Sequence, residues 1–119
     1  MSLEVKLTHH INCNEIVLSG SPLTDHDFYP LIDEVNSLLN NNEANIILNL
    51  EKIKLLNSLG LNSLIKVMTK CRNQGGDLHI VNISDKISQV LLLTKLNTVL
   101  NIAPSLNEAI NQFAIDNES

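Results

Sequence analysis

Strand patterns and amphipathic helical patterns alternate along most of this chain, and this alternation restricts the fold more than any other feature of the sequence. Apolar and polar residues alternate at residues 3–8, and a second strand pattern follows at 15–19, so the turn between them predicts an antiparallel hairpin. In the rest of the chain each strand pattern is followed by a helical one, which predicts a mainly parallel sheet.

The later elements are expected in a fixed order. They are a helix near residues 24–39, a strand at 44–50, a helix at 59–73, a strand at 78–83, a helix starting at 84 or 85, a short edge strand at Ile102 and a last helix starting at 104 or 105. The predicted fold class is α/β, with a four- to five-stranded mixed sheet, an N-terminal hairpin and about four helices.

Each predicted helix carries one apolar face, because its apolar residues recur mostly three and four positions apart. The four stripes consist of Phe28, Leu31, Ile32, Val35, Leu38 and Leu39; of Leu61, Leu64, Ile65, Met68 and Cys71; of Ile87, Val90, Leu91 and Leu93; and of Leu106, Ala109, Ile110 and Phe113. In the strand at 78–83, Leu78, Ile80 and Ile83 are expected on one face and Val81 on the other. A chain of 119 residues is short for two domains, so these residues are the predicted core of a single domain, residues 1–119.

Composition argues against several classes of function. The formal net charge is -5 and aromatic residues make up 3% of the chain, so a nucleic acid would meet neither a basic surface nor enough stacking side chains. The apolar runs are far shorter than a membrane span, and the first ten residues do not resemble a signal peptide. We therefore expect a cytoplasmic protein that binds no nucleic acid and has no membrane span.

No residue pattern in the chain predicts catalysis, a cofactor or a metal site. Cys13 and Cys71 form no C-x-x-C pair, and Cys71 lies on an apolar helical stripe, which indicates a buried, reduced thiol. His9 and His10 are adjacent on a strand, so their side chains are expected to point to opposite faces and to share no metal.

The segment at residues 54–64, KLLNSLGLNSL, combines a helix start with exposed apolar residues. Either Asn57 or Ser58 is a good N-cap, because its side-chain oxygen accepts a backbone N–H at the start of the helix. Gly60 falls in the first turn, where the missing side chain allows another surface to approach the backbone. Leu59 lies off the apolar stripe and is expected to face outward. The segment is therefore predicted to be a contact patch for another protein.

Ser58 permits two interpretations, a plain capping serine or a phosphorylation site. A phosphate at a helix N-terminus meets free N–H groups and the positive end of the helix dipole, so the fold tolerates it. It would add roughly -1.5 to -2 charge and would repel a partner packed on the patch. The residues alone leave both interpretations open.

The chain resembles the STAS domain family (sulfate transporter and anti-sigma-factor antagonist), in particular its stand-alone bacterial antagonists. In that family a central strand ends in an aspartate-serine-serine/threonine-glycine-leucine turn that opens a helix, and the first serine is phosphorylated. Residues 57–61, NSLGL, occupy that place after the strand-like ANIILNL. Residues 74–78, 96–102 and 105–110 are similar to the helix-to-strand step and the closing segment of the family.

The resemblance implies a protein-binding module, not an enzyme, that is regulated by phosphorylation of Ser58. The expected partner is an anti-sigma factor that is also a serine kinase with an ATPase-like fold, and binding it would release a sigma factor. The contact surface would comprise Asn57, Ser58, Leu59, Gly60 and Leu61. The protein is expected to be a monomer or a weak homodimer.

Two alternatives come from other classes of function. Asn57 stands where the family usually has aspartate, and Leu59 replaces the second serine or threonine. These departures motivate a STAS-like scaffold that is never phosphorylated, such as a subunit of a transport or lipid-trafficking complex. A small hydrolase with Ser58 as the nucleophile would instead need a histidine and an acid nearby in space.

Overall fold

The structure, a computed structural model, describes residues 3–118, and of residues 115–118 it describes the backbone alone. Its elements are β1 (Leu3–His9), β2 (Asn14–Gly20), the 3-10 helix η1 (Asp25–Phe28), α1 (Tyr29–Asn40), β3 (Asn45–Lys52), α2 (Ser58–Asn73), β4 (Asp77–Val81), α3 (Asp85–Thr94), the 3-10 helix η2 (Leu96–Thr98), β5 (Asn101–Ile102) and α4 (Leu106–Glu118). The expected order of strands and helices is confirmed, and two short 3-10 helices are added to it.

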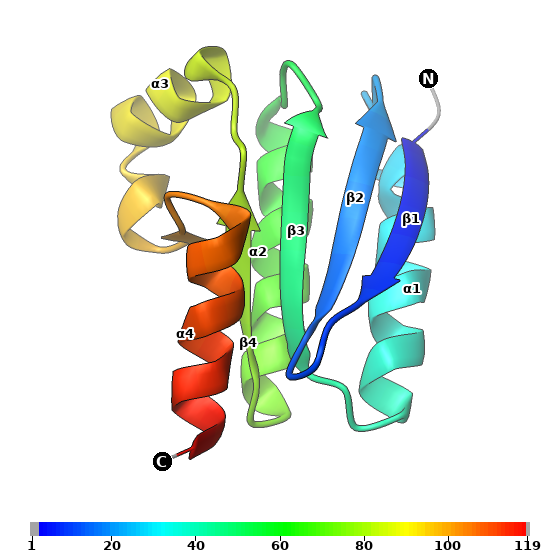
Figure 1. The fold of residues 1–119 in the computed structure, drawn as a ribbon. Helices are drawn as coiled ribbons and strands as arrows, with labels where there is room; N and C mark the ends of the chain where they lie inside the picture. Colours follow the sequence, from blue (N-terminus) through cyan, green and yellow to red (C-terminus); the bar gives the residue numbers. More distant parts are fainter. Residues whose placement is uncertain (1–2, 119) are drawn as a thin grey trace.

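The strands form one mixed sheet in the order β1-β2-β3-β4-β5. β1 is antiparallel to β2, as expected for the hairpin, whereas β2 to β5 are parallel to one another. The register pairs Ile16 with Leu48 and Leu48 with Ile80, so aliphatic side chains of neighbouring strands share one face. Helices α1 and α2 cover this face, and α4 lies on the other (Figure 1). The predicted α/β fold is confirmed.

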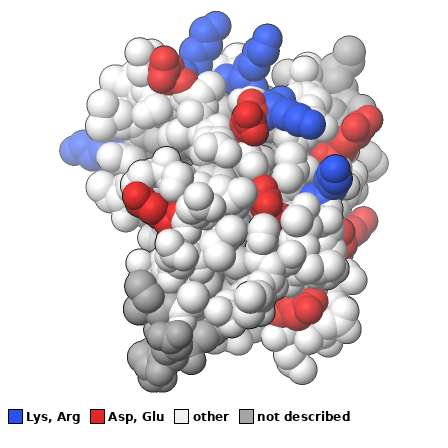
Figure 2. Space-filling model, in the orientation of Figure 1, with Lys and Arg blue, Asp and Glu red and all other residues white. Residues whose placement is uncertain are grey.

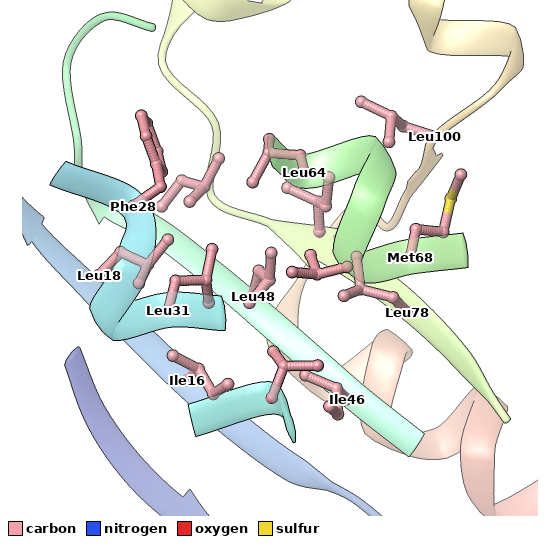
Figure 3. Packing of buried hydrophobic residues seen from close by; sticks show 14 of the residues in the cluster. Ile16, Leu18, Phe28, Leu31, Ile46, Leu48, Leu64, Met68, Leu78 and Leu100 are labelled. Carbon is pink, nitrogen blue, oxygen red and sulfur yellow. The ribbon is translucent and has the colours of Figure 1, made fainter. Parts of the chain in front are cut away.

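The main core lies between the sheet and helices α1 and α2 (Figure 3). The apolar stripes predicted for these helices face into it, and Leu31, Val35 and Cys71 are completely buried. Each fully buried aliphatic side chain stabilises the fold by roughly 1.5–3 kcal/mol relative to an exposed one. This face of the sheet therefore supplies most of the apolar burial of the domain.

α4 covers only the part of the opposite face that is formed by β3 and β4 (Figure 1). A second, smaller cluster of buried residues lies beneath it, consisting of Cys13, Ile47, Val81, Ala109 and Phe113. The Phe113 ring packs edge-on against the ring of His79, with centroids 4.6 Å apart. β1 and β2 have no helix over them on this face, and the side chains of Glu4 and Lys6 are exposed there.

The step from α2 to β4 depends on the predicted glycine pair. Gly75 has φ +84, a left-handed conformation that favours glycine. A Cβ atom on Gly76 would lie 2.1 Å from the carbonyl oxygen of Ala44, a backbone atom that has little room to move. The close approach brings the chain entering β4 against the chain entering β3.

One predicted core position and one predicted strand end are wrong. Leu93 is 83% exposed, because α3 buries Ile87 and Leu91 and a residue two positions after Leu91 lies on the other side of the helix. Ile83 lies beyond β4, which ends at Val81, because Asn82 adopts φ 60 and turns the chain out of the sheet. Ile83 is nevertheless partly buried and packs against the main core.

Candidate functional site

The segment predicted as a contact patch lies at the carboxyl end of β3, where the chain passes into α2. Residues 53–57 form the connection, which we call the site loop. Ile53 and Leu56 are buried in the main core, whereas Lys54 and Leu55 between them are exposed. The two buried anchors hold the loop against the domain and present the intervening side chains outward.

Asn57 is the N-cap of α2, and its side chain makes two hydrogen bonds. Its Oδ1 accepts the backbone N–H of Gly60 at 2.9 Å, which satisfies one of the free donors at the helix start. Its Nδ2 donates to the carbonyl oxygen of Leu23 at 2.8 Å. The second bond joins the start of α2 to the connection that follows β2, and an aspartate at this position could not donate it.

Ser58 is therefore the first residue of α2 and not its cap. Its side chain is exposed, and its hydroxyl has no hydrogen-bond partner among the described residues. A group attached to that oxygen would lie beside the free N–H groups and the positive end of the helix dipole. The position suits an anionic modification.

The other predicted contact residues divide into exposed and buried ones. Leu59 faces outward and is 39% exposed, as expected. Gly60 and Leu61 are buried, and a Cβ atom on Gly60 would lie 2.8 Å from the Phe28 ring and 3.0 Å from Leu56. The missing side chain of Gly60 thus makes room for the protein's own core, and Asn57, Ser58 and Leu59 are the part of the patch that a partner can reach.

A groove lies beside the site loop, between it and the connection after β2. We call it the β2–β3 groove; it has a volume of about 520 Å³ and is lined by Gly20, Ser21, Pro22, Leu23, Lys52, Lys54, Leu55 and Asn57. Leu23 and Leu55 are 57% and 59% exposed, so the lining offers a partner both apolar surface and two cations. The sequence patterns did not predict this groove, because its two walls are about 30 residues apart in the chain and meet only in the folded sheet.

Asp27 holds the outer wall of the groove in place. One of its carboxylate oxygens accepts the backbone N–H of Leu23 at 2.8 Å and that of Thr24 at 3.1 Å. These hydrogen bonds lower the pKa of Asp27 to about 2, so the carboxylate is ionised at neutral pH. Its charge is directed at backbone donors of the wall.

A buried polar network lies on the α4 face of the sheet and was not predicted. The carboxylate of Glu15, which is 5% exposed, accepts from His10 Nε2 at 3.0 Å and from Asn49 Nδ2 at 2.9 Å. Asn49 Oδ1 in turn accepts from Asn82 Nδ2 at 3.2 Å. The sequence does contain a sign of this network, because Glu15 in β2 and Asn49 in β3 each place a charged or amide side chain inside an otherwise apolar strand pattern.

The two adjacent histidines form separate contacts. His9 Nδ1 lies within hydrogen-bond distance of Asn14 Oδ1, whereas His10 bonds Glu15 on the other side of the strand.

In the described part of the chain no group of three or more His, Cys, Asp and Glu side chains is arranged to hold a metal. No hydrogen bond joins Ser58 to a histidine or an acid among the described residues. None of the helices within residues 3–118 is long and apolar enough to cross a membrane.

Comparisons with known proteins agree with this architecture. Residues 5–109 match the family model described as STAS domain. An anti-sigma factor antagonist from Mycobacterium paratuberculosis has the same fold, with a TM-score of 0.78 at 18% identity over 95% of this chain and 95% of that one. No match was found among curated proteins.

The Bacillus cell fate determinant SpoIIAA also has this fold. Its phosphorylated form superposes with a TM-score of 0.68 at 20% identity, covering 92% of this chain and 98% of that one. The anti-sigma factor antagonist SpoIIAA in its unphosphorylated form superposes with a TM-score of 0.73, also at 20% identity, over 92% and 95% of the two chains.

Proposed function

This chain belongs to the STAS domain family, and we propose that within it the protein is a partner-binding module of the anti-sigma-factor-antagonist type. The unphosphorylated form binds an anti-sigma factor that is also a serine kinase with an ATPase-like fold, and so releases a sigma factor. The protein is the substrate of that kinase, not an enzyme itself, and it acts in the cytoplasm as one domain. The fold similarity to anti-sigma factor antagonists supports the proposal.

The observation that carries the proposal is the exposed hydroxyl of Ser58 at the first position of α2. Leu59 lies next to it, and Leu55 on the site loop adds more exposed apolar surface. A partner packed on these leucines would exclude water from the edge of Ser58. Gly60 and Leu61 support the surface from below, since both are buried.

Phosphorylation would switch this surface with little change of fold. The phosphate would add roughly -1.5 to -2 charge beside the leucines, and a packed partner would have to desolvate that charge. The free N–H groups at the start of α2 would stabilise the same phosphate in the unbound protein. Both effects favour the dissociated state.

The alternative is a scaffold that is never phosphorylated, in a transport or lipid-trafficking complex. One observation favours it: the Asn57 amide donates to Leu23 and fastens the loop beside Ser58, at a place where the family usually has a carboxylate. A kinase that recognises that carboxylate would not find it here. In this alternative the same surface binds a permanent partner.

The test is a phosphorylation and binding assay with a candidate serine kinase, chosen from genes that neighbour the gene of this protein. We expect ATP to add one phosphate to the peptide that contains Ser58, read by mass spectrometry, and none to the Ser58→Ala variant. Binding of the kinase should persist in Ser58→Ala and weaken at least about tenfold in Ser58→Asp. Ser37→Ala, at an exposed serine of α1, is the matched control and should behave as the wild type.

Binding without any phosphate on Ser58 would favour the scaffold over the switch. If the kinase neither modifies nor binds the protein, the proposed partner is wrong.

A further inference from the structure

The β2–β3 groove differs in charge from the chain as a whole. The chain has eight basic and thirteen acidic residues, yet the groove is lined by two lysines, Lys52 and Lys54, and by no acidic residue. Neither lysine has a carboxylate within salt-bridge distance among the described residues. Figure 2 shows several Lys and Arg side chains at the upper end of the molecule, where β3 ends, with acidic side chains beside them and elsewhere on the face.

The acidic residues near the groove do not cancel these two charges. Asp27 directs its carboxylate at the backbone N–H groups of Leu23 and Thr24. Glu51 precedes Lys52 on β3 and is not among the residues that line the groove. Asp85 lies in the first turn of α3, where the helix dipole favours an acid. The positive potential of the two lysines is therefore available to a ligand.

The groove is also lined by apolar residues. Leu23 on one wall and Leu55 on the other are more than half exposed, and Pro22 is buried behind them. Asn57 connects the groove to the patch at Ser58, because it lines the groove and immediately precedes Ser58 in the chain. One partner could thus cover both surfaces without a gap.

From this charge complementarity we propose that the β2–β3 groove binds a segment of the partner protein in which an aliphatic side chain is flanked by Asp or Glu residues. The aliphatic side chain packs between Leu23 and Leu55, and the carboxylates meet Lys52 and Lys54. The inference rests on the proposed function, since it describes the partner of the same site. It also adds to the switch: a phosphate on Ser58 competes with the partner's carboxylates for the same two cations.

The first test uses peptides and the full isotope-labelled chain, and so does not depend on the identity of the partner. One heptapeptide has a central leucine flanked by glutamates and aspartates, and the other has lysines in their place. We expect the acidic peptide to shift the backbone NMR signals of residues 20–23 and 52–57, and the basic peptide to leave them unchanged. Lys52→Glu combined with Lys54→Glu should remove these shifts.

The matched control changes Lys66→Glu and Lys70→Glu, two exposed lysines further along α2, and should keep the shifts. The inference would be overturned if the acidic and basic peptides caused equal NMR shifts, or if neither peptide shifted the signals of the groove residues. It would also be overturned if the Lys52/Lys54 and Lys66/Lys70 variants lost the shifts to the same extent. Shifts caused by inorganic phosphate but not by the acidic peptide would assign the groove to a small anion and would also overturn it. If ultracentrifugation showed that the wild type self-associates and that only the Lys52/Lys54 variant does not, the groove would instead bind a second copy of this chain.

The second test uses the kinase of the preceding section. The Lys52/Lys54 variant should bind it about tenfold more weakly at low salt, with a smaller difference at high salt, while the Lys66/Lys70 variant binds as the wild type. Kinase binding that Ser58→Asp weakens but the Lys52/Lys54 variant does not would overturn this inference and leave the proposed function standing. A wild-type protein that does not bind the kinase contradicts the proposed partner, and the peptide experiment then decides the groove by itself.

Discussion

The two faces of the sheet differ in how they bury their side chains. On the face covered by α1 and α2, neighbouring strands contribute mainly aliphatic residues, and one continuous apolar core results. On the face of α4, a small apolar cluster around Phe113 lies beside the buried network of Glu15, Asn49 and His10. The first face depends on the total apolar area that it buries, whereas the second depends on individual hydrogen bonds.

The difference bears on the candidate site. Ile53 and Leu56 anchor the site loop in the first core, so the surface at Ser58 is supported by the larger of the two apolar clusters. The Glu15 network joins β2, β3 and the residue after β4 by side-chain hydrogen bonds. We infer that local opening of the domain begins on the α4 face and leaves the site loop in place.

The two phenylalanines allow the largest test of this comparison, because the chain has one on each face. Phe28→Ala and Phe113→Ala should each destabilise the fold by about 3–5 kcal/mol, with Phe28→Ala at the upper end because its ring packs between α2 and the main core. Urea unfolding measures the difference. Hydrogen exchange should show that Phe113→Ala exposes mainly the amides of α4, and a loss of protection spread equally over α1 and α2 would contradict the comparison.

Glu15 tests whether the second face depends on hydrogen bonds. Glu15→Ala leaves the Asn49 amide buried without its acceptor and should cost roughly 1–3 kcal/mol in the free energy of unfolding. Glu15→Gln keeps one acceptor oxygen and should cost less. Glu4→Gln, at an exposed acid of β1 on the same face, is the control and should change little. An equal cost for Glu15→Ala and Glu4→Gln would show that the network does not stabilise the fold.

The reactivity of the two cysteine thiols gives another comparison of the two faces of the sheet. Burial, with a smaller contribution from Glu15, raises the pKa of Cys13 from 9.0 to about 11, and burial, with a contribution from Asp77, raises that of Cys71 to about 12. Cys13 belongs to the cluster under α4, and Cys71 belongs to the main core. A thiol reagent at neutral pH should therefore modify Cys13 before Cys71, as read by mass spectrometry. Modification of Cys71 first would contradict the order of opening.

The same pKa values predict a dependence of stability on alkaline pH. Both folded-state values lie above the ordinary value of 9.0, so the unfolded chain loses these protons first. The contribution of the protonated thiols is complete below about pH 9 and is lost as the pH rises toward 11 and 12. Unfolding experiments at pH 8 and pH 10.5 should show a smaller decline in a variant with both cysteines changed to alanine than in the wild type.

The smallest effect is expected on the strip of the α4 face that no helix covers. Lys6→Gln, at an exposed position of β1, should change the free energy of unfolding by no more than about 0.5 kcal/mol. A larger cost would mean that the uncovered strip contributes to stability, and the distinction between the covered and uncovered parts of this face would then be wrong.

The order of the elements and most residues of the main core could be predicted from local patterns in the sequence. A period of two at residues 3–8 and spacings of three and four at Leu31, Val35 and Leu38 are local properties, and the secondary structure inherits them directly. The position of Ser58 at a helix start was predictable for the same reason. The choice between Asn57 and Ser58 as the cap was not, since both side chains can accept the N–H of the first turn.

The folded structure settles that choice, because the Asn57 amide reaches the carbonyl oxygen of Leu23, a residue 34 positions earlier in the chain. It also decided that Gly60 faces Phe28, that Leu93 is exposed, and that Glu15 is buried by His10 and Asn49. The physical reason is common to all of these. A periodic pattern shows which face of an element is apolar, but which groups meet that face depends on the pairing of segments that are distant in sequence.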